Sequence, residues 1–250
     1  MKKTLSLLVM AAASVSASAI TPLWLRDVKI SPDGQSIAFT YRGDIYTVPA
    51  AGGEAKRITT AADYECNPVW SPDSKSIAFA SDKHGNFDVF IVPATGGTPT
   101  RLTTYSASEI PESFAPDGKS VIYSASIQDP ASSALFPTSR LAELYSVPVT
   151  GGAFTQIIAT PANNIDFAPD GKTMYYDVRP GMENEWRKHH TSSVTGDIWK
   201  YDPVKGTYTN MTNRPGEDRN PVVSPDGKTV YFLSLRSVGS KTHSTGPSHD

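Results

Sequence analysis

The sequence has little of several features that would point to common functions. Its 250 residues include one cysteine, Cys66, which excludes an intramolecular disulfide framework and a cysteine-rich zinc site. Basic residues are not in excess, because 23 Lys and Arg stand against 25 Asp and Glu, so the chain offers no positive surface to a nucleic acid. Helical periodicity of any length is also missing. What remains is a turn-rich chain, with 20 prolines and 18 glycines, which favours an all-β fold.

The N-terminal segment 1–19 has the features of a secretory signal peptide. Lys2 and Lys3 precede an apolar run over 5–13, and Ala17-Ser18-Ala19 is a small-x-small cleavage site. We therefore predict cleavage after Ala19 and a periplasmic or secreted protein. Loss of both lysines lowers the basic residues from 23 to 21 against 25 acidic ones, and the formal charge from −2 to −4. No later stretch approaches about 20 apolar residues, so no membrane span is predicted after cleavage.

A repeat dominates the rest of the sequence. A Pro-Asp turn recurs five times, and the residue two positions before each proline is apolar. The copies are Pro32-Asp33-Gly34, Pro72-Asp73-Ser74, Pro116-Asp117-Gly118, Pro169-Asp170-Gly171 and Pro225-Asp226-Gly227. Proline presets φ at the second turn position and glycine supplies a positive φ, which is typical of a hairpin with a bulge. The repeated aspartates are therefore interpreted as turn formers.

Each unit continues in the same order. A short apolar run follows the turn, and in four units an acidic residue, a branched aliphatic residue and an aromatic residue come next. These are Asp44-Ile45-Tyr46, Asp88-Val89-Phe90, Glu143-Leu144-Tyr145 and Asp197-Ile198-Trp199. A glycine turn and a fourth β-prone run, such as 56–60 or 101–104, close these units. The turn prolines are 40, 44, 53 and 56 residues apart. Four antiparallel strands repeated at about this spacing predict a β-propeller of four-stranded antiparallel blades, four of them complete and a fifth that ends after its second strand near Ser234.

The connections between strands predict which end of the propeller carries function. Named in chain order, each unit has strands a, b, c and d. Antiparallel alternation places the a–b and c–d turns on one rim, here the turn rim, and the b–c loops and d–a connectors on the other, the loop rim. The b–c loops lengthen along the chain, from 41–43 to 125–142 and 178–196. Because long loops at one end of a rigid scaffold usually carry binding, the loop rim is the predicted functional face.

The repeats resemble those of a known family. The segments 43–53 and 81–90, with Asp-Ile-Tyr-Thr-Val-Pro before Gly-Gly, are similar to the WD-like repeats of TolB and of tricorn protease, and most similar to the amino-terminal propeller of secreted, tricorn-like serine peptidases. The resemblance covers roughly residues 22–234. It implies an incomplete six-bladed propeller, since the family's amino-terminal propeller usually has six blades, followed in such enzymes by a second propeller, a PDZ-like domain and a catalytic domain.

The resemblance also implies a domain division. We expect a signal peptide over 1–19, a TolB/tricorn-like β-propeller over 20–234 and an unstructured tail over 235–250, which is polar and lacks the repeat pattern. The hypothesis that follows is a truncated or frameshifted product of a longer tricorn-like gene. An unclosed propeller exposes strand edges and blade faces, so self-association is expected.

No catalytic or metal-binding signature is found in the sequence. No Gly-x-Ser-x-Gly motif surrounds a serine, and His189-His190 lie in the long loop 178–196 without a nucleophile signature. Asp82, Asn86 and Asp88 alternate as in a calcium loop, but Gly85 is misplaced and no bidentate glutamate follows. We therefore expect no catalytic residue, no cofactor and no metal.

The candidate residues for binding a substrate or a partner lie at the loop rim. Acidic residues just before strand a are expected at this rim near the channel mouth, where together with Arg219 they would select peptides by charge. Trp186 and Arg187, in the longest loop, belong to residue types that often anchor a partner. The full set is Glu65, Glu109, Glu112, Trp186, Arg187, Asp218 and Arg219. Cys66 is expected as a small buried group on an inner strand.

The sequence predicts a non-catalytic propeller segment of a secreted tricorn-like peptidase that gates or binds peptides or protein substrates. The missing peptidase domains would be its partners in a full-length protein. The alternative is a TolB-like propeller that binds a periplasmic protein. A propeller lyase or glycosidase is disfavoured because the strand cores are apolar rather than rich in His, Arg and carboxylates.

Overall fold

The structure is a computed structural model that describes residues 24–127, 141–158, 160–178 and 195–235. All regular secondary structure in these ranges is β-strand. This confirms the predicted all-β class. The same ranges offer no helix of the length and hydropathy that crossing a bilayer requires. The predicted signal peptide, the loop residues Trp186 and Arg187 and the predicted tail from 236 onward lie outside the described residues.

Within the described ranges the strands form four four-stranded antiparallel sheets and one two-stranded sheet, each with neighbouring strands in chain order. These sheets are blades 1 to 5. Blade 1 contains β1 (Arg26–Ile30), β2 (Ser36–Tyr41), β3 (Asp44–Pro49) and β4 (Lys56–Arg57). Blade 2 contains β5 (Glu65–Trp70), β6 (Ser76–Ser81), β7 (Asp88–Pro93) and β8 (Thr100–Arg101). Blade 3 contains β9 (Glu109–Phe114), β10 (Ser120–Ala125), β11 (Glu143–Pro148) and β12 (Thr155–Ile158). Blade 4 contains β13 (Asn163–Phe167), β14 (Met174–Val178), β15 (Asp197–Asp202) and β16 (Thr207–Asn210), and blade 5 contains β17 (Asp218–Val223) and β18 (Val230–Ser234).

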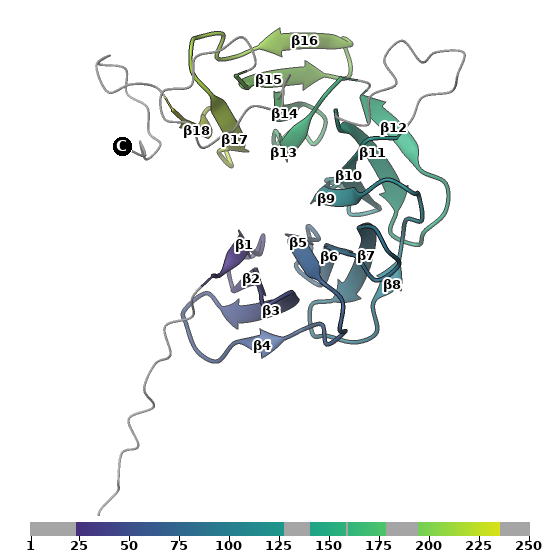
Figure 1. Ribbon diagram of the computed structural model, residues 1–250. Helices are drawn as coiled ribbons and strands as arrows, with labels where there is room; N and C mark the ends of the chain where they lie inside the picture. Colours follow the sequence, from purple (N-terminus) through teal and green to yellow (C-terminus); the bar gives the residue numbers. More distant parts are fainter. Residues whose placement is uncertain (1–23, 128–140, 159, 179–194, 236–250) are drawn as a thin grey trace, which may run out of the picture.

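The blades are arranged around a common axis (Figure 1). Strand a of every blade lies innermost, and β4, β8, β12 and β16 lie outermost (Figure 1). Inner strands of consecutive blades pack together, as β1 with β5, β5 with β9, β9 with β13 and β13 with β17. The ring is open between blade 1 and blade 5 (Figure 1). The predicted incomplete propeller, with four full blades and a partial fifth, is therefore confirmed.

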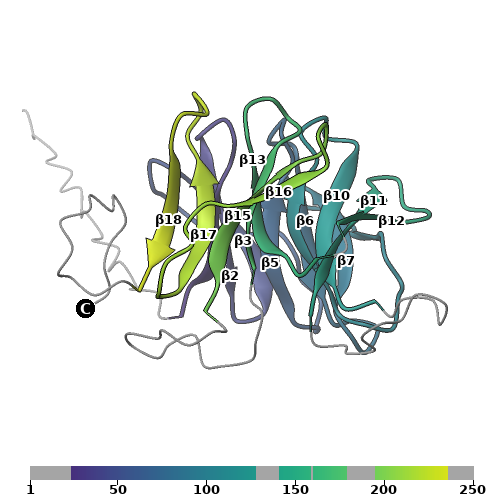
Figure 2. The same ribbon diagram turned by 90° about the horizontal axis from the view of Figure 1, so that it is seen from above.

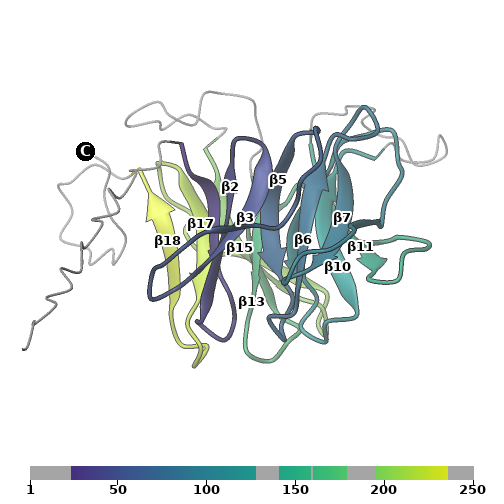
Figure 3. The same cartoon turned by 90° about the horizontal axis from the view of Figure 1, so that it is seen from below.

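The Pro-Asp turns all join strand a to strand b and lie on the same rim, as the side views in Figure 2 and Figure 3 show. In blade 2, Ser71 Oγ donates to Asp73 Oδ1 at 2.6 Å, and Lys75 N donates to the same oxygen at 3.1 Å. The Ser71 hydroxyl is the main reason that the pKa of Asp73 lies below its usual value. The aspartate thus stabilises the turn by accepting hydrogen bonds within it, which is the structural role that the repeat predicts.

Successive Pro-Asp turns also contact one another around the rim. A Cβ placed on Gly118, Gly171 or Gly227 would lie 3.7, 3.4 or 3.1 Å from the proline ring of the preceding turn, and these rings belong to Pro72, Pro116 and Pro169. In these three turns the glycine at the third position therefore has two reasons to be glycine: a positive φ and the closeness of the preceding proline. The turn rim is a closely packed surface.

In blades 1 and 2, strand d is shorter than the sequence predicts, because a threonine side chain interrupts its main-chain pairing. In blade 2, Leu102 N donates to Val89 O at 2.8 Å, but Val89 N donates to Thr103 Oγ1 at 2.9 Å. Blade 1 repeats the arrangement, with Ile45 N donating to Thr59 Oγ1 at 2.9 Å. The predicted runs 56–60 and 101–104 follow strand c as expected, but only Lys56–Arg57 and Thr100–Arg101 are regular strands.

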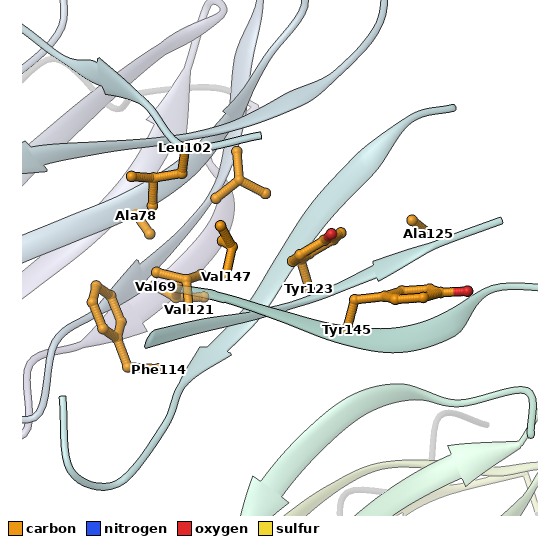
Figure 4. Close-up of a cluster of buried hydrophobic side chains, with 10 residues drawn as sticks. Val69, Ala78, Leu102, Phe114, Val121, Tyr123, Ala125, Tyr145 and Val147 are labelled. Carbon is orange, nitrogen blue, oxygen red and sulfur yellow. The ribbon is translucent and has the colours of Figure 1, made fainter. Parts of the chain in front are cut away.

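Apolar side chains fill the spaces between blades. One cluster joins blades 2 and 3, and Figure 4 shows its members pointing toward one another from both sheets. Val69 and Ala78 come from blade 2, and Val121 and Tyr123 from blade 3. Aromatic rings of strands b and c also pair within a blade, as Tyr123 does with Tyr145 at 5.8 Å between ring centroids. Each blade therefore buries its faces against the next one.

The stacked turns generate a stability prediction. Gly34→Ala and Gly227→Ala both place a side chain at a φ near +70°, but only Gly227 has a proline ring within 4 Å. We expect Gly34→Ala to cost about 1 kcal/mol for the left-handed backbone. Gly227→Ala should cost roughly 1–2 kcal/mol more, because the new methyl group meets Pro169. Thermal unfolding followed by circular dichroism measures both, and equal losses of Tm would contradict the turn-to-turn contact.

Candidate functional site: the axial cavity

A cavity of about 610 Å³ lies at the axis of the propeller. Residues from the inner strand of each described blade line it. They are Val28, Lys29, Ile30, Ser31, Pro32, Val69, Trp70, Glu112, Ser113, Asn164, Ile165, Asp166, Asn220, Pro221 and Val222. Such a volume lies in the range of sites that bind small ligands, and the lining combines apolar and polar residues in nearly equal number. The cavity is therefore the candidate functional site.

A β-bulge near the beginning of the inner strands shapes the cavity wall. Pairing with strand b shifts register at this point in all five blades. Four of the bulges hold a residue with φ between 50° and 54° at the same repeat position, namely Asp27, Asn67, Asn164 and Asn220. Asn and Asp tolerate this left-handed conformation better than other residues with a side chain. In blade 3 the position holds Pro111.

The bulges turn main-chain N–H groups toward carboxylates of the preceding blade. Asn164 N donates to Glu112 Oε2 at 2.9 Å, and Asn220 N donates to Asp177 Oδ2 at 2.9 Å. Asn67 N donates to Asp27 Oδ2 at 3.2 Å. Three carboxylates, two from inner strands and one from β14, thus link each following inner strand to the blade before it through a charge-assisted hydrogen bond.

Glu112 and Asp166, the two acidic residues of the cavity lining, are both held by hydrogen bonds. Glu112 also accepts from Ser124 Oγ at 2.7 Å, and Asp166 accepts from Val223 N at 2.7 Å. Burial is the main cause that raises the pKa of both carboxyls, and the hydrogen bonds oppose it. Lys29 is exposed in the same lining and lowers both pKa values by its charge.

Three of the predicted binding residues begin an inner strand at the loop rim, as expected, but they are buried between blades. Glu65 is 2% exposed, and Glu109 and Asp218 are 0% exposed. Their main-chain N–H groups donate to Gly43 O, Phe87 O and Gly196 O of the preceding blade at 2.7–2.8 Å. Their side chains lie in the spaces between blades rather than on the surface. The sequence places these residues along the strand, but it does not reveal which way each side chain points.

These buried carboxyls belong to a recurring polar cluster. In blade 2, Asp88 is 0% exposed and pairs with Arg101 at 2.8 Å, and Asp44 forms the matching ion pair with Arg57 in blade 1. Glu109 lies beside the blade 2 pair, and Glu65 beside that of blade 1. In blade 4 the equivalent aspartate, Asp197, accepts from Asn210 Nδ2 at 2.8 Å. The acidic residue of each strand c is therefore tied to strand d.

The remaining predicted residues have various environments. Glu112 lines the cavity and Arg219 is half-buried at the beginning of β17. Trp186 and Arg187 lie outside the described residues. Cys66, which we expect to be buried, is half-buried in β5, and burial raises the pKa of its thiol to about 12. A role of any of these residues in binding stays a prediction.

The three residues weighed as a calcium loop make separate contacts. Asp82 accepts from Tyr64 N at 2.7 Å, and Asn86 Nδ2 donates to Ala107 O at 2.8 Å. Asp88 pairs with Arg101. Among the described residues, no group of three or more His, Cys, Asp or Glu is placed to hold a metal ion.

Sequence reasoning missed Lys29, Trp70 and Asn220 as cavity residues. A signal for them exists, because each lies within five positions before a Pro-Asp turn, on an inner strand. Asn220 shares its position with Asn67 and Asn164, and Trp70 stands at the repeated apolar position, so only the Lys29 position lacks a repeated residue type.

The fold defines a β-propeller domain with a cavity on its axis. The sequence matches the family described as the tricorn protease N-terminal beta propeller domain over residues 22–242, and the chain belongs to this family. The predicted resemblance is thereby confirmed. A segment of 80 residues is 36% identical to dipeptidyl-peptidase 5 of Porphyromonas endodontalis. That segment spans 31% of this chain and 11% of the relative.

Solved structures of other proteins share the fold. A putative TolB from Agrobacterium tumefaciens superposes with a TM-score of 0.69 at 23% identity, over 86% of this chain and 71% of that one. The tricorn protease superposes with a TM-score of 0.67 at 23% identity, over 84% of this chain and 20% of that one. These similarities show the propeller fold, and the chain spans only a small part of the protease.

The polar cluster of blade 1 generates a prediction about pH. Burial raises the pKa of Glu65 from 4.5 to about 7, and repulsion by Asp44 and Asp63 adds to the effect of burial. A carboxyl whose pKa is higher in the folded chain binds more protons there than in the unfolded chain. Stability should therefore fall as the pH rises from about 4.5 to 7.

Glu65→Gln should make this fall smaller, by the share that Glu65 contributes, and make the protein more stable than the unaltered chain above pH 7. Urea unfolding between pH 4 and 8 measures the effect. Glu54→Gln, at an exposed position, is the matched control and should keep the original pH profile. An unchanged profile in the Glu65 variant would show that this carboxyl does not carry the pH dependence.

Proposed function

We propose that this chain is the peptide-binding propeller of an exported, tricorn-like serine peptidase, and that it binds or gates substrates without cleaving them. The axial cavity carries the proposal, because it is lined by all five described inner strands in a chain of the tricorn propeller family. The peptidase chemistry would belong to domains outside this segment. The family match and the shared fold with tricorn protease support this reading.

The chemistry of the lining favours an extended peptide. Apolar groups such as Val28 and Val222 are exposed in it and would contact side chains of the peptide. Glu112 and Asp166 already accept main-chain hydrogen bonds, whereas Lys29 is exposed. The amine of Lys29 would therefore select peptides with acidic groups. Trp70 donates from Nε1 to Lys29 O at 3.0 Å, which fixes the backbone beneath this amine.

Binding of labelled peptides tests the proposed function. Unstructured peptides rich in Asp and Glu should bind more tightly than basic ones of equal length. Lys29→Glu should weaken the acidic peptides about tenfold, since it reverses a charge in a partly enclosed site. Lys56→Glu, at an exposed position on the outer strand β4, is the matched control and should bind as the unaltered chain does. No peptide binding by either protein would refute the proposal.

The alternative is a TolB-like propeller whose rim holds a folded protein, which the shared fold with the putative TolB also allows. The two readings differ in the size of the partner. If short peptides displace the labelled peptide and folded proteins do not, the peptidase function is favoured. If the chain instead binds a folded envelope protein, and the Lys29→Glu variant binds it equally well, the TolB-like function is favoured. A peptidase assay on the full-length gene product, beside this chain, tests the catalytic part.

Export and the domain division are part of the same proposal. We place the signal peptide at 1–19, the propeller at 20–234 and the tail at 235–250. Expression with the complete leader in a bacterial host should yield a periplasmic or secreted chain whose intact mass begins at Ile20. Ala19→Lys should block cleavage, because the site requires small residues. An intact mass that still includes Met1 in the unaltered chain would contradict the signal peptide.

A further inference from the structure

A second cavity, of about 410 Å³, lies between blades 3 and 4. These blades are neighbours in the ring, and both contribute to the lining (Figure 1). The lining reaches the turn rim, since it includes Pro116 and Gly171 of two successive Pro-Asp turns. It shares no residue with the lining of the axial cavity. The space is therefore a separate candidate for a binding site.

Apolar side chains form the walls of this cavity. Ile122 and Met174 are buried members of the core cluster between blades 3 and 4, and Phe167 and Tyr201 pack against that cluster. The ring of Tyr201 stacks on Tyr208 of β16, with centroids 4.7 Å apart. The walls are thus held in place by the packing of the two blades, which favours binding of an apolar group.

Blade 3 departs from the repeat where it borders this cavity. In blade 2, Ala78 of β6 lies opposite Ile91 of β7, and Ile91 packs against the core between blades 2 and 3. In blade 3 the large residue is on the other strand, since Ile122 of β10 lies opposite Ser146 of β11. Ser146 lines the cavity. Its short side chain leaves space beside β11 that an isoleucine would fill.

The Pro-Asp turn of blade 3 departs from the repeat at the same cavity. In blade 2, Ser71 Oγ donates to Asp73 Oδ1 at 2.6 Å. Blade 3 has Ala115 at the position of Ser71, so Asp117 lacks this hydroxyl donor. Asp117 Oδ1 accepts from Lys119 N at 3.0 Å, and within the described ranges no other donor reaches this carboxylate. Asp117 is exposed and lines the cavity, so its Oδ2 can accept from a ligand.

Lys172 adds a positive charge to the same lining. It follows the Pro-Asp turn of blade 4 and is exposed. In the part of the chain that the structure describes, its amine forms no ion pair. The lining therefore combines a carboxylate and an ammonium group with apolar walls. A ligand with a single charge would be repelled by one of the two groups, whereas a zwitterion complements both.

We propose that this cavity binds a free α-amino acid with a branched aliphatic or aromatic side chain. The ammonium group of the ligand donates to Asp117, its carboxylate pairs with Lys172, and its side chain lies against Ile122, Phe167 and Met174. The terminal residue of a peptide carries only one of the two charges, so the zwitterion distinguishes a free amino acid from a peptide end. This site does not depend on the proposed function of the axial cavity.

Calorimetric titration of the full chain with L-phenylalanine tests the proposal. We expect saturable binding. N-acetylphenylalanine and phenylalanine amide each lack one charge, and glycine lacks the side chain, so each should bind at least about tenfold more weakly. Absence of phenylalanine binding would overturn the proposal. Equal binding of phenylalanine and its amide would also overturn it, because the end of a peptide would then be an equally good ligand.

Two variants locate the site. Ser146→Ile places the residue of blade 2 in the cavity and should abolish binding without lowering Tm, because the space accommodates the larger side chain. Thr47→Ile, at the same repeat position in blade 1, is the matched control and should bind as the unaltered chain does. Asp117→Asn should weaken binding about tenfold, since it removes the charge and can still accept from the turn. Asp73→Asn is its matched control in blade 2 and should leave binding unchanged.

The asparagine variant keeps the test decisive if Ser146→Ile lowers Tm, because Asp117 lies on an exposed turn. Undiminished binding by both cavity variants would overturn the proposal. So would loss of binding in Lys29→Glu alone, because the amino acid would then lie in the axial cavity. Lys29→Glu should leave phenylalanine binding unchanged, which separates this result from the test of the proposed function.

Discussion

The burial of each blade between two neighbours is the constraint on which the structure depends. A four-stranded sheet with apolar residues on both faces cannot exclude water alone, so its faces become interior only when sheets are stacked about an axis. The cluster between blades 2 and 3 shows this directly, since Val69 and Tyr123 meet from different sheets. Where the stacking stops, as at Ile30 and Val222, similar residues are exposed. The axial cavity exists because the inner strands converge without meeting.

Several charged side chains stabilise the contacts between blades and within them. Asp27, Glu112 and Asp177 accept N–H groups from the following blade, and Asp88 is tied to Arg101 inside its own blade. A carboxylate close to a cavity can be misinterpreted as a binding residue. Here the carboxylates of Glu112 and Asp166 accept main-chain hydrogen bonds from the following blade, and Lys29 is the charged residue of the axial cavity lining that remains exposed.

Much of the fold can be predicted from the sequence, because the turns are local. Pro32-Asp33-Gly34 and its copies specify their conformation within a few residues, and their spacing gives the blades. The length of strand d was not predictable in this way, since Thr59 and Thr103 replace main-chain acceptors through their side chains. The burial of Glu65 and Glu109 depends on the neighbouring blade, which no local pattern encodes. The same holds for the cavity, whose lining residues are distant in sequence and differ between repeats.

Pro111 shows that the blades are not interchangeable units. It occupies the bulge position at which Asn67, Asn164 and Asn220 each offer an N–H to the preceding blade, and proline has none to offer. The acceptors also come from different places: Asp27 and Glu112 from inner strands, and Asp177 from β14. Transplanting blade 3 to follow blade 1 would place a proline opposite Asp27, which would keep only its hydrogen bond from Thr40 Oγ1. At these three boundaries donor and acceptor therefore match as a pair, so a blade of this propeller fits only a neighbour that carries the complementary group.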